Sequence, residues 1–599
     1  MDINETLRDA QFKDASPVKT VEKILGILQE NGIETEEFWF ESNVPYCHAL
    51  RISILGTSFS VNGKGLTREF ARASGYGELM ERLQLGFTGA PGMQKDGSYS
   101  FDETKYPPIP RNQLQGQRYE KLAQRLADFT DIRLTPQELL QQFATEQDTI
   151  PCVPCYNITT ATPDFFPNDI RLKVYGSNGC AAGNSMEEAI VQALSEIVER
   201  HHQNHILLNN LTPPDVPEEV LQTSKTAYDI IQYVRAQGYR VIIKDCSLGE
   251  KFPVVCACFI QESTGKYHTH FGAYPIFEIA LERALTETFQ GRNINSFAKF
   301  ADLTYRATDS ASLTNVVNEF TYGAWTKSPA FFVGTPSYPY NNTVGFVGNG
   351  NKALLTECID YFKAMGHEIL VCNSATLGFP TCQVLVPGYS EIFINRLHGK
   401  TSDHRYYRHS VKALRCPSTS SIQDKLGMLM HLEQMDKIAN RVRHMHGFLN
   451  NARLSADLTD LEEATLMTAT LGYVYYDLGR YGDVIKCLDQ LIPTADEAQL
   501  PHLIGLKRYL TLKLQKKDED LIRKTMELFH DSEVVADIYS KRNPMDRYTL
   551  HCDLTCPKDC LLHGKCYNKR VTELDNLISQ KIRALDHTAF VSQLDTLLH

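Results

Sequence analysis

A signature of two glutamates and an arginine occurs twice in this sequence. The first copy is Gly77–Arg82 (GELMER) and the second is Ser195–Arg200 (SEIVER). Because positions i and i+3 share a face of an α-helix, each copy predicts a helix that presents two carboxylates together. Four such carboxylates repel one another in one fold unless cations lie between them. The repeat therefore indicates two helices that face a shared cation site, such as one where Mg²⁺ bridges carboxylates to phosphate oxygens.

The polar sides of the two predicted helices match position for position, and a third helix repeats the pattern. The stripes are Ser74, Glu78 and Glu81 in the first helix, Gln192, Glu196 and Glu199 in the second, and Arg283, Glu287 and Gln290 in the third. A single stripe is usually a solvated helix face with ion pairs worth about 0.3–0.5 kcal/mol each. Two matching stripes and a third one favour a shared site instead.

Glycine-rich stretches lie beside the first two helices. They are Asn62–Gly65 and Gly176–Gly179, with Gly183 and Asn184 close behind. We expect turns there, because glycine lets the backbone approach a ligand without a Cβ in the way. The sequence has no G-x-x-x-x-G-K-[ST] motif, which excludes a P-loop as the phosphate-binding element.

The composition and net charge limit the kinds of protein that this chain can be. The chain has 599 residues, 42% hydrophobic and 22% charged, which is typical of a soluble protein with more than one domain. A net charge of −11 argues against a general nucleic-acid binder but is compatible with a nucleotide held through metal ions. No run of about 18 apolar residues and no apolar signal core is present. We therefore expect a cytoplasmic protein without a membrane segment.

Mixed helix and strand signals extend to about residue 420 and predict an α/β or α+β domain. Helices are expected over 17–32, 67–86, 185–208, 217–237 and 276–292, and strands within 46–60, 240–244, 253–261, 368–373 and 381–385. Residues 95–150 indicate an insertion with short helices.

Strand signals almost vanish beyond residue 420. Helices are expected over 422–446, 460–479, 482–492, 499–515 and 518–530. The segment LGYVYYDLGRYGDVIKCLDQLI has the spacing of a tetratricopeptide-type helical pair, and a small helical bundle explains it equally well. We expect a catalytic domain at 1–420, an all-α, tetratricopeptide-like domain at 421–545, and a cysteine-rich segment with C-terminal helices at 546–599.

Four stretches of the first domain form a specific combination of motifs. They are NGKGLTREFARASGYGELMER, YGSNGCAAGNSMEEAIVQALSEIVER, HFGAYPIFEIALERALTETFQGR and VLVPGYSEI. Over about residues 10–395 the chain resembles the YcaO family of ATP-using enzymes, in particular its long bacterial members with a helical C-terminal region. The resemblance implies an ATP-binding fold without a P-loop. It also implies an enzyme that phosphorylates a backbone amide oxygen, so that a nucleophile can add to the carbon.

The resemblance implies roles for individual residues by motif position. The implied Mg²⁺ ligands are Glu78, Glu81, Glu188, Glu196, Glu199 and Glu287. The implied nucleotide contacts are Lys13, Ser74, Glu78, Asn184, Gln192, Arg200 and Arg283. Arg200, Arg283 and Glu287 would act at the reacting phosphate, where the two arginines offset its charge. Thr20 stands where the family has a serine.

The added nucleophile decides the product in this family. A neighbouring Cys, Ser or Thr gives an azoline, sulfide gives a thioamide, and an amine gives an amidine. Many members end in a proline-rich segment linked to proton transfer, whereas this sequence ends in FVSQLDTLLH. That difference favours the thioamide branch, or the accessory role that long bacterial members have in β-methylthiolation of a small-subunit ribosomal protein. The shared motifs contain no clear catalytic base.

Three functions therefore stay open. The first is activation of a peptide or protein amide, or assistance to ribosomal-protein methylthiolation. The second is thioamide or azoline formation in a ribosomally made peptide natural product. The third is a non-catalytic scaffold with a vestigial ATP site. Expected partners are a peptide or protein substrate, a methylthiotransferase or sulfur donor protein, and a second copy of the chain in a homodimer. We expect no membrane and no direct nucleic-acid contact.

The sixteen cysteines are scattered over many segments, and four of them lie close together near the C-terminus. Cys552, Cys556, Cys560 and Cys566 fall within 15 residues, so they could hold a structural Zn²⁺ or an iron–sulfur cluster. Their spacing is not that of a standard finger or ferredoxin, and reduced packing cysteines explain them equally well. Elsewhere, the flanking prolines place Cys152 and Cys155 in an extended packing segment, and Cys180 is expected to be a small buried thiol. His201 and His202 are expected to be helix-end residues rather than ligands.

Overall fold

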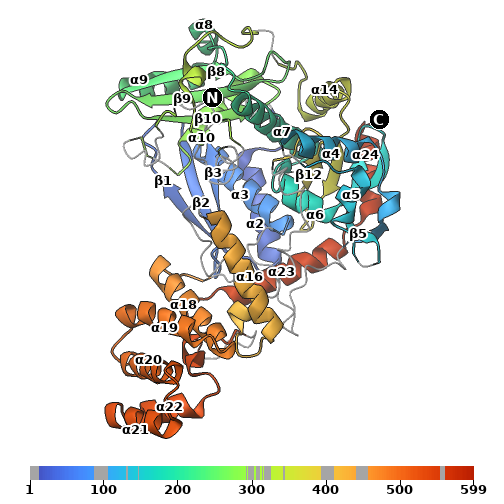
Figure 1. Cartoon of the computed structure of the whole chain (residues 1–599). Coiled ribbons are helices and arrows are strands. Elements are labelled where there is room, and N and C mark those ends of the chain that lie inside the picture. The colour runs from blue at the N-terminus through green and yellow to red at the C-terminus, as the bar shows by residue number, and fades with distance from the viewer. Residues whose placement is uncertain are drawn as a thin grey trace.

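The fold consists of a body of sheets and helices and a helical region that extends from it (Figure 1). The computed structural model describes residues 12–86, 106–129, 132–145, 147–291, 293–294, 302–304, 311–312, 315, 326–341, 345–392, 410–439, 456–552 and 560–598. In this part of the chain, no helix combines the length and the apolar character that crossing a bilayer requires.

Three antiparallel sheets organise the body. The first has the order β1-β2-β3, with β1 (Thr35–Phe40), β2 (His48–Ile54) and β3 (Ser60–Gly65). The second has the order β10-β9-β8, with β8 (Tyr239–Asp245), β9 (Val254–Gln261) and β10 (Tyr267–Ala273). The third has the order β4-β5-β11-β12-β7, and β6 pairs with β5; its strands are β4 (Pro108–Pro110), β5 (Thr149–Asn157), β6 (Thr162–Pro167), β7 (Cys180–Ala182), β11 (Leu370–Asn373) and β12 (Thr381–Leu385).

One strand of each sheet is followed closely by a helix that packs against it. These helices are α3 (Arg68–Gln84) after β3, α7 (Met186–Leu208) after β7, and α10 (Phe277–Thr288) after β10. The hydroxyls of Thr67 and Ser185 cap the first two helices by accepting from backbone N–H groups. The three helices that carry the predicted polar stripes therefore occupy equivalent positions in three sheet–helix units.

Glycine permits close packing at each of these junctions. A Cβ on Gly65 would lie 2.4 Å from the backbone nitrogen of Ala71. A Cβ on Gly183 would lie 2.7 Å from the nitrogen of Ala189, and one on Gly272 would lie 2.5 Å from the carbonyl oxygen of Ala280. Contacts this short exclude any side chain at these positions. A glycine at each junction thus lets all three helices pack directly against their strands.

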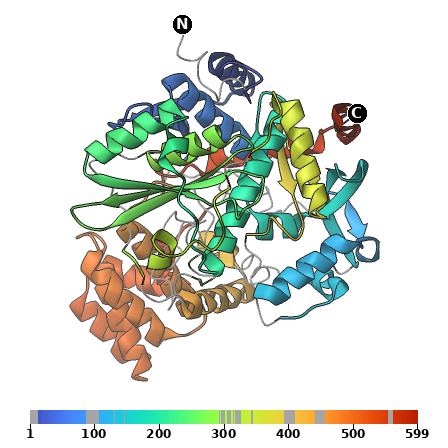
Figure 2. The same ribbon diagram turned by 90° about the horizontal axis from the view of Figure 1, so that it is seen from above.

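The apolar faces of these helices form the core. In α3, Leu79, Met80 and Leu83 are fully buried. In α7, the fully buried residues are Ile190, Val191, Leu194, Ile197 and Val198. Each such side chain contributes about 1.5–3 kcal/mol by burial. Helix α7 contacts both β10 and β12, and Figure 2 shows it in teal between the green sheet and the yellow helix and strands.

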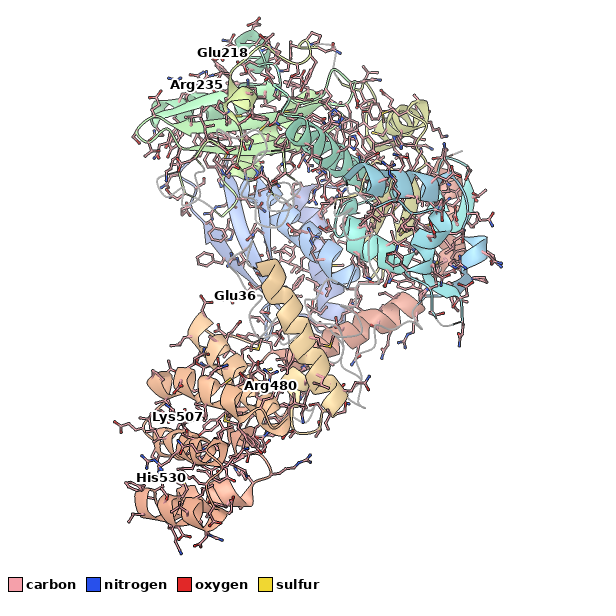
Figure 3. All side chains as sticks on the ribbon, in the orientation of Figure 1. Glu36, Glu218, Arg235, Arg480, Lys507 and His530 are labelled. Atoms are coloured by element: carbon pink, nitrogen blue, oxygen red, sulfur yellow. The ribbon has the colours of Figure 1, made fainter. Side chains whose placement is uncertain are left out.

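Several elements differ from the prediction. The single helix expected over 217–237 is two helices in the structure, α8 (Glu218–Leu221) and α9 (Lys225–Ala236). A hydrogen bond joins them: Arg235 Nη1 donates to Glu218 Oε1 at 2.6 Å (Figure 3). The turn expected at Asn62–Gly65 lies in strand β3. The sequence also did not indicate β1, β6, β10 or α14 (Asn351–Ala364).

The remaining helices of the body are short or flank the core. α2 (Pro17–Glu30) occupies the helix predicted at 17–32, and α13 (Pro329–Phe332) is one turn long. Residues 106–145 of the predicted insertion form β4, α4 (Gln117–Phe129) and α5 (Pro136–Gln141). Cys152 and Cys155 lie buried in strand β5, which confirms their assignment to an extended packing segment. Cys180 is buried as expected.

The region after residue 420 is helical, as predicted. Its helices are α16 (Ile422–Ala439), α18 (Asp460–Asp477), α19 (Tyr481–Leu491), α20 (Leu500–Leu514), α21 (Glu519–Phe529) and α22 (Ser532–Ser540). Consecutive helices from α18 to α21 pack on one another around Val484, Leu488, Leu506 and Met526. The tetratricopeptide-like character of this region stays a prediction.

The last two helices return to the body. α23 (Asn568–Arg583) places Leu574 and Ile578 in the apolar cluster of α2 and the first sheet. α24 (His587–Leu598) places Phe590 and Leu594 in the largest cluster of the body. Arg570 Nη2 donates to the carbonyl oxygen of Gly32 at 2.6 Å. The predicted segment 546–599 thus contains a cysteine-bearing stretch beside the helical region and two helices that pack on the body.

We expect Gly63→Ala to destabilise the body by about 2 kcal/mol or more. Gly63 lies on β3 under α3, and a Cβ there would lie 2.2 Å from the carbonyl oxygen of Ala71 and 2.6 Å from the nitrogen of Gly75. The matched control is Gly77→Ala in α3, where nothing lies within 4 Å of the added Cβ. That change should leave stability unchanged or raise it by up to about 1 kcal/mol. Urea unfolding followed by circular dichroism measures both, and equal midpoints for the two variants would contradict the close packing.

Candidate nucleotide and metal site

A cavity of about 370 Å³ lies where α3, α7 and α10 meet. All residues to which the resemblance assigned a nucleotide or Mg²⁺ role line this cavity: Lys13, Ser74, Glu78, Glu81, Asn184, Glu188, Gln192, Glu196, Glu199, Arg200, Arg283 and Glu287. Thr20 lines it too, whereas Gln290 lies beyond the end of α10 and does not. The structure therefore brings the three stripes together, and the roles of the individual residues stay predictions.

The cavity is lined by more carboxylates than cations. The seven carboxylates are those of Glu78, Glu81, Glu188, Glu196, Glu199, Glu282 and Glu287. The five cations are Lys13, Lys64, Arg82, Arg200 and Arg283. Such a surplus of acids in a partly enclosed space favours the binding of further cations.

The arginine of each signature neutralises glutamates of its own copy. In α3, Arg82 Nε lies 3.4 Å from Glu81 Oε1 and 3.8 Å from Glu78 Oε1. In α7, Arg200 Nη2 lies 3.1 Å from Glu196 Oε1. The E-x-x-E-R sequence is thus an acidic pair with a counter-ion built into the next residue, and this explains how the pair tolerates burial.

Burial shifts the pKa values of the acids upwards. It raises the pKa of Glu81 to about 8, although the positive charge of Arg82 opposes the shift. It also raises the pKa values of Glu78 and Glu199. A metal ion that binds such carboxyls displaces their protons and repays the cost of burying their charge. The acids therefore fit a cation site better than a solvated helix face.

Lys64 is a site residue that the sequence analysis missed. Its ammonium group contacts the carboxylate of Glu287 on α10. Burial and the nearby charge of Arg283 lower the pKa of Lys64 to about 8, while Glu78 and Glu199 oppose the shift. The lysine in the NGKG stretch was the available signal, but the stretch was interpreted as a turn.

Glu188 holds the N-terminal segment against α7. Its Oε2 accepts from the backbone nitrogens of Asp14 at 3.1 Å and Asn184 at 3.2 Å, and from Asn184 Nδ2 at 3.1 Å. Lys13 Nζ lies 3.5 Å from its Oε1. Thr20 Oγ1, at the position where the family has serine, donates to Asn184 Oδ1 at 2.8 Å. Glu188 would have to exchange some of these partners to act as the implied Mg²⁺ ligand.

Two further bonds fix the stripes relative to each other. Arg283 Nη1 on α10 donates to Gln192 Oε1 on α7 at 2.5 Å. The backbone nitrogen of Ala273 at the end of β10 donates to Glu199 Oε2 at 3.1 Å. The second and third sheet–helix units are therefore joined at the cavity wall by groups that belong to the predicted site.

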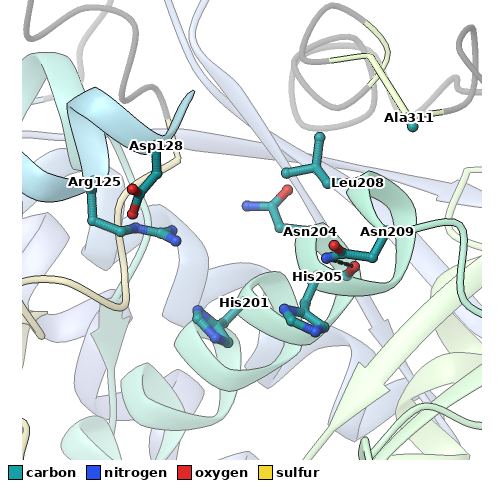
Figure 4. A pocket seen from close by; sticks show the side chains of 8 residues that line it. All are labelled: Arg125, Asp128, His201, Asn204, His205, Leu208, Asn209 and Ala311. Atoms are coloured by element: carbon teal, nitrogen blue, oxygen red, sulfur yellow. Dashed lines mark hydrogen bonds between the residues drawn. The ribbon is translucent and has the colours of Figure 1, made fainter. Parts of the chain in front are cut away.

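A second cavity, of about 440 Å³, lies along another face of α7 (Figure 4). Its lining residues are Arg125, Asp128, His201, Asn204, His205, Leu208, Asn209 and Ala311. The ring of His201 stacks on that of Tyr389 with 3.6 Å between centroids. Burial lowers the pKa values of His201 and His205, which favours the neutral form of both imidazoles. His202 is buried and bonds the carbonyl oxygen of Cys246. None of these histidines lines the acidic cavity, so none is placed there as a catalytic base.

Comparison with known proteins gives a clear family match. The family model described as "YcaO cyclodehydratase, ATP- and Mg²⁺-binding" matches residues 62–390. The "Ribosomal protein S12 methylthiotransferase accessory factor YcaO" of Escherichia coli is 28% identical over 396 residues, which is 64% of this chain and 66% of that protein. An uncharacterized protein of Haemophilus influenzae is 29% identical over 391 residues, with the same coverage. The match thus spans just under two thirds of these relatives' length.

Solved structures give weaker likenesses. A heterocyclase in complex with substrate and cofactor has a TM-score of 0.45 at 20% identity, covering 63% of this chain and 53% of its own. The structure of YcaO from Methanopyrus kandleri bound with AMPPCP and Mg²⁺ has a TM-score of 0.39 at 20% identity, covering 63% and 92%. Both TM-scores lie below 0.5, and the family model is the stronger finding.

Proposed function

Since this chain belongs to the YcaO family, we propose that it is an ATP- and Mg²⁺-dependent enzyme that activates a backbone amide of a peptide or protein. The observation that supports the proposal is the convergence of three polar helix stripes on one cavity with a surplus of carboxylates. A vestigial site would be expected to have lost some of these charged residues. Their retention therefore favours an active site over a non-catalytic scaffold.

The residues present fit a nucleotide with bound Mg²⁺. Glu78, Glu81, Glu196 and Glu199 would hold the metal ions, joined by Glu287 and, after exchange of its partners, Glu188. Bound ATP with Mg²⁺ would supply a phosphoryl group for transfer to the amide oxygen. Arg200 and Arg283 would orient the phosphates and offset their charge, with Lys64 beside them. Holding the amide and phosphate together could supply about 7–11 kcal/mol of barrier reduction.

The proposed reaction balances without a redox partner. The amide oxygen forms a bond to the terminal phosphorus, and the bond to the ADP oxygen breaks. A nucleophile then adds to the amide carbon, and phosphate leaves with the former amide oxygen. With hydrosulfide as nucleophile, the products are a thioamide, ADP and hydrogen phosphate, which takes up the hydrosulfide proton. No histidine is among the described residues that line the cavity.

The substrate class is proposed from the relatives' names. The E. coli relative is named as an accessory factor for methylthiolation of ribosomal protein S12. We propose the same protein class as the first candidate substrate, with a methylthiotransferase or sulfur donor protein as partner. The family description as a cyclodehydratase favours a second candidate, azoline or thioamide formation in a ribosomally made peptide. The homodimer stays a prediction.

ATP turnover with candidate substrates tests the function. We expect ADP release to rise when S12 and sulfide are added, and the mass of S12 to change by replacement of one oxygen by sulfur. A peptide rich in Cys, Ser and Thr should instead lose water if the second candidate holds. ATP binding without any mass change in either substrate, and with purified partner proteins present, would contradict amide activation.

A further inference from the structure

A third cavity, of about 250 Å³, lies between the end of β8 and the start of α10. We call it the Asp245 pocket. Two carboxylates line it, Asp245 and Glu278, together with the rings of Phe277, Tyr340 and Phe346. No lysine, arginine or histidine is among the described residues that line it. The pocket thus combines negative charge with aromatic surface, and the proposed reaction uses none of these residues.

Asp245, the last residue of β8, is fixed in place while one of its oxygens stays available. Its side chain is 3% exposed, and its Oδ1 accepts from the backbone nitrogen of Ser247 at 2.9 Å. The hydroxyl of Tyr338 donates to its carbonyl oxygen at 2.9 Å. Its Oδ2 is buried and accepts no hydrogen bond from a described residue. A buried acceptor without a partner costs about 1–3 kcal/mol, and more when it is charged, so a ligand that donates here is favoured.

Further acids surround this carboxylate. Burial raises the pKa of Tyr340, and the charges of Asp245 and Glu219 raise it further, so both acids act on this ring of the pocket. Burial also raises the pKa of Asp245, although bonds from Ser247 and from the backbone of Asn341 oppose the shift. A bound cation would offset the cost of burying the charge of Asp245. The pocket therefore fits a positively charged ligand.

The rings of the pocket are suited to a cation as well. The face of an aromatic ring attracts positive charge. The ring of Phe346 already contacts one cation, because Lys251 Nζ lies 4.4 Å from its centroid. That lysine does not line the pocket, and Glu357 Oε2, at 3.1 Å, offsets its charge. A second cation inside the pocket would thus meet carboxylates and rings rather than an uncompensated positive charge.

An organic cation suits the pocket better than a metal ion. Two carboxylates are too few to hold a metal on their own, and in the described part of the chain no three His, Cys, Asp or Glu side chains are placed to hold one. The same finding applies to Cys552, Cys560 and Cys566, whereas Cys556 lies outside the described residues.

The size of the pocket limits the organic cation to a small group. Sites for free small molecules usually measure about 300–1,000 Å³, and this pocket is smaller, so it fits a single side chain. A guanidinium group stacks on aromatic rings and gives up its water more readily than an ammonium group. It also donates several hydrogen bonds, which Asp245 Oδ2 can accept. The chemistry of the pocket therefore matches an arginine side chain.

The first turn of α10 connects this pocket to the acidic cavity. Phe277 and Glu278 line the pocket, whereas Ile279 and Arg283 of the same helix line the acidic cavity. A helix is about 10 Å across, and an extended chain advances about 3.3 Å per residue. A polypeptide that passes around this turn would therefore span both places with about five residues.

We propose that the Asp245 pocket binds an arginine side chain of the polypeptide substrate, about five residues from the amide that lies in the acidic cavity. The proposal rests on the proposed function, because it assigns part of the substrate of that reaction. The net charge of −11 also favours a basic partner. An arginine at this spacing would thus help to select which amide reaches the phosphate.

Peptide binding in the absence of ATP tests the pocket directly. The probes are a capped Gly-Arg-Gly tripeptide and the same peptide with citrulline, which has nearly the same shape but no charge. Ligand-observed NMR should show that wild type binds the arginine peptide at least about tenfold more tightly than the citrulline peptide. Asp245→Asn keeps an oxygen that can accept from Ser247 and loses the charge, so its two affinities should agree within about twofold. The matched control is Asp360→Asn, an exposed residue of α14, which should keep the wild-type preference.

The comparison of the two peptides on wild type does not depend on the folding of any variant. Equal binding of the two peptides to wild type, or an arginine preference that survives in Asp245→Asn, would overturn the proposal. Tighter binding of a capped Gly-Lys-Gly peptide would overturn the assignment to arginine. These measurements need neither ATP nor turnover, so their failure leaves the proposed enzymatic function standing. Intact arginine binding without amide activation would instead contradict the proposed function.

Discussion

Arg283→Ala is expected to weaken Mg²⁺-dependent ATP binding at least about 100-fold, which corresponds to about 2.7 kcal/mol. Three effects add. The variant would lose the proposed charge-assisted contact to phosphate, and it leaves Gln192 without its 2.5 Å partner across the cavity. It also removes a positive charge near Glu199 and Lys64, so the net charge of the residues that line the cavity becomes more negative. Titration calorimetry with ATP and excess Mg²⁺ measures the change.

Two comparisons make this result specific. Arg240→Ala removes an arginine whose side chain is 69% exposed and lies 3.9 Å from Glu262, and it should bind ATP as the wild type does. Arg283→Lys keeps the positive charge but loses the planar guanidinium group that can donate two parallel hydrogen bonds. Its affinity for ATP should therefore lie between those of wild type and Arg283→Ala. If Arg283→Ala binds ATP with unchanged affinity, the assignment of the cavity as the nucleotide site is wrong.

Glu199→Gln is expected to reduce ATP turnover about 1,000-fold. The amide oxygen of glutamine can still accept from the nitrogen of Ala273, which lies 3.1 Å from Glu199 Oε2 in the wild type. The variant therefore keeps the position of the side chain and loses its charge. A metal ligand changed in this way should also shift the Mg²⁺ dependence of turnover to much higher concentration. Steady-state ADP release across a Mg²⁺ titration gives both values.

The matched control for this variant lies on the same helix. Glu187 is on α7 next to Glu188 and does not line the acidic cavity. Glu187→Gln makes the same chemical change, and turnover should stay within about twofold of wild type, because this partly exposed side chain does not line the cavity. Equal effects of the two substitutions would indicate that the net charge of α7 matters, rather than a ligand at position 199.

The site was predictable where its residues repeat with helical spacing. Glu78 with Glu81 and Glu196 with Glu199 could be placed on common faces, because a helix fixes the relative direction of side chains three and four residues apart. The matching of the stripes then predicted that the helices meet. The glycines at the junctions were noted as permitting close approach. The structure shows that these glycines approach the following helix rather than a ligand, and the sequence alone could not show this.

Residues that tertiary packing brings to one place could not be predicted from the sequence. Lys64 belongs to the site because tertiary packing brings the end of β3 beside α10, where the lysine contacts Glu287. Strands that contain glycine or proline, such as β3 and β5, give a weak sequence signal. The contact between Cys416 and Cys552 likewise could not be predicted from the sequence. The two residues are 136 positions apart, and their contact depends on tertiary packing.

The return of α23 and α24 to the body has a consequence for the order of events during synthesis. Helix α2 carries Thr20 of the cavity wall, yet Leu574 and Ile578 of α23 complete its apolar packing. During synthesis, this face of α2 therefore stays exposed until α23 has left the ribosome. A truncated product would carry an unfinished cavity wall. Nucleotide binding should therefore be weaker in fragments that lack α23 than in chains that contain it.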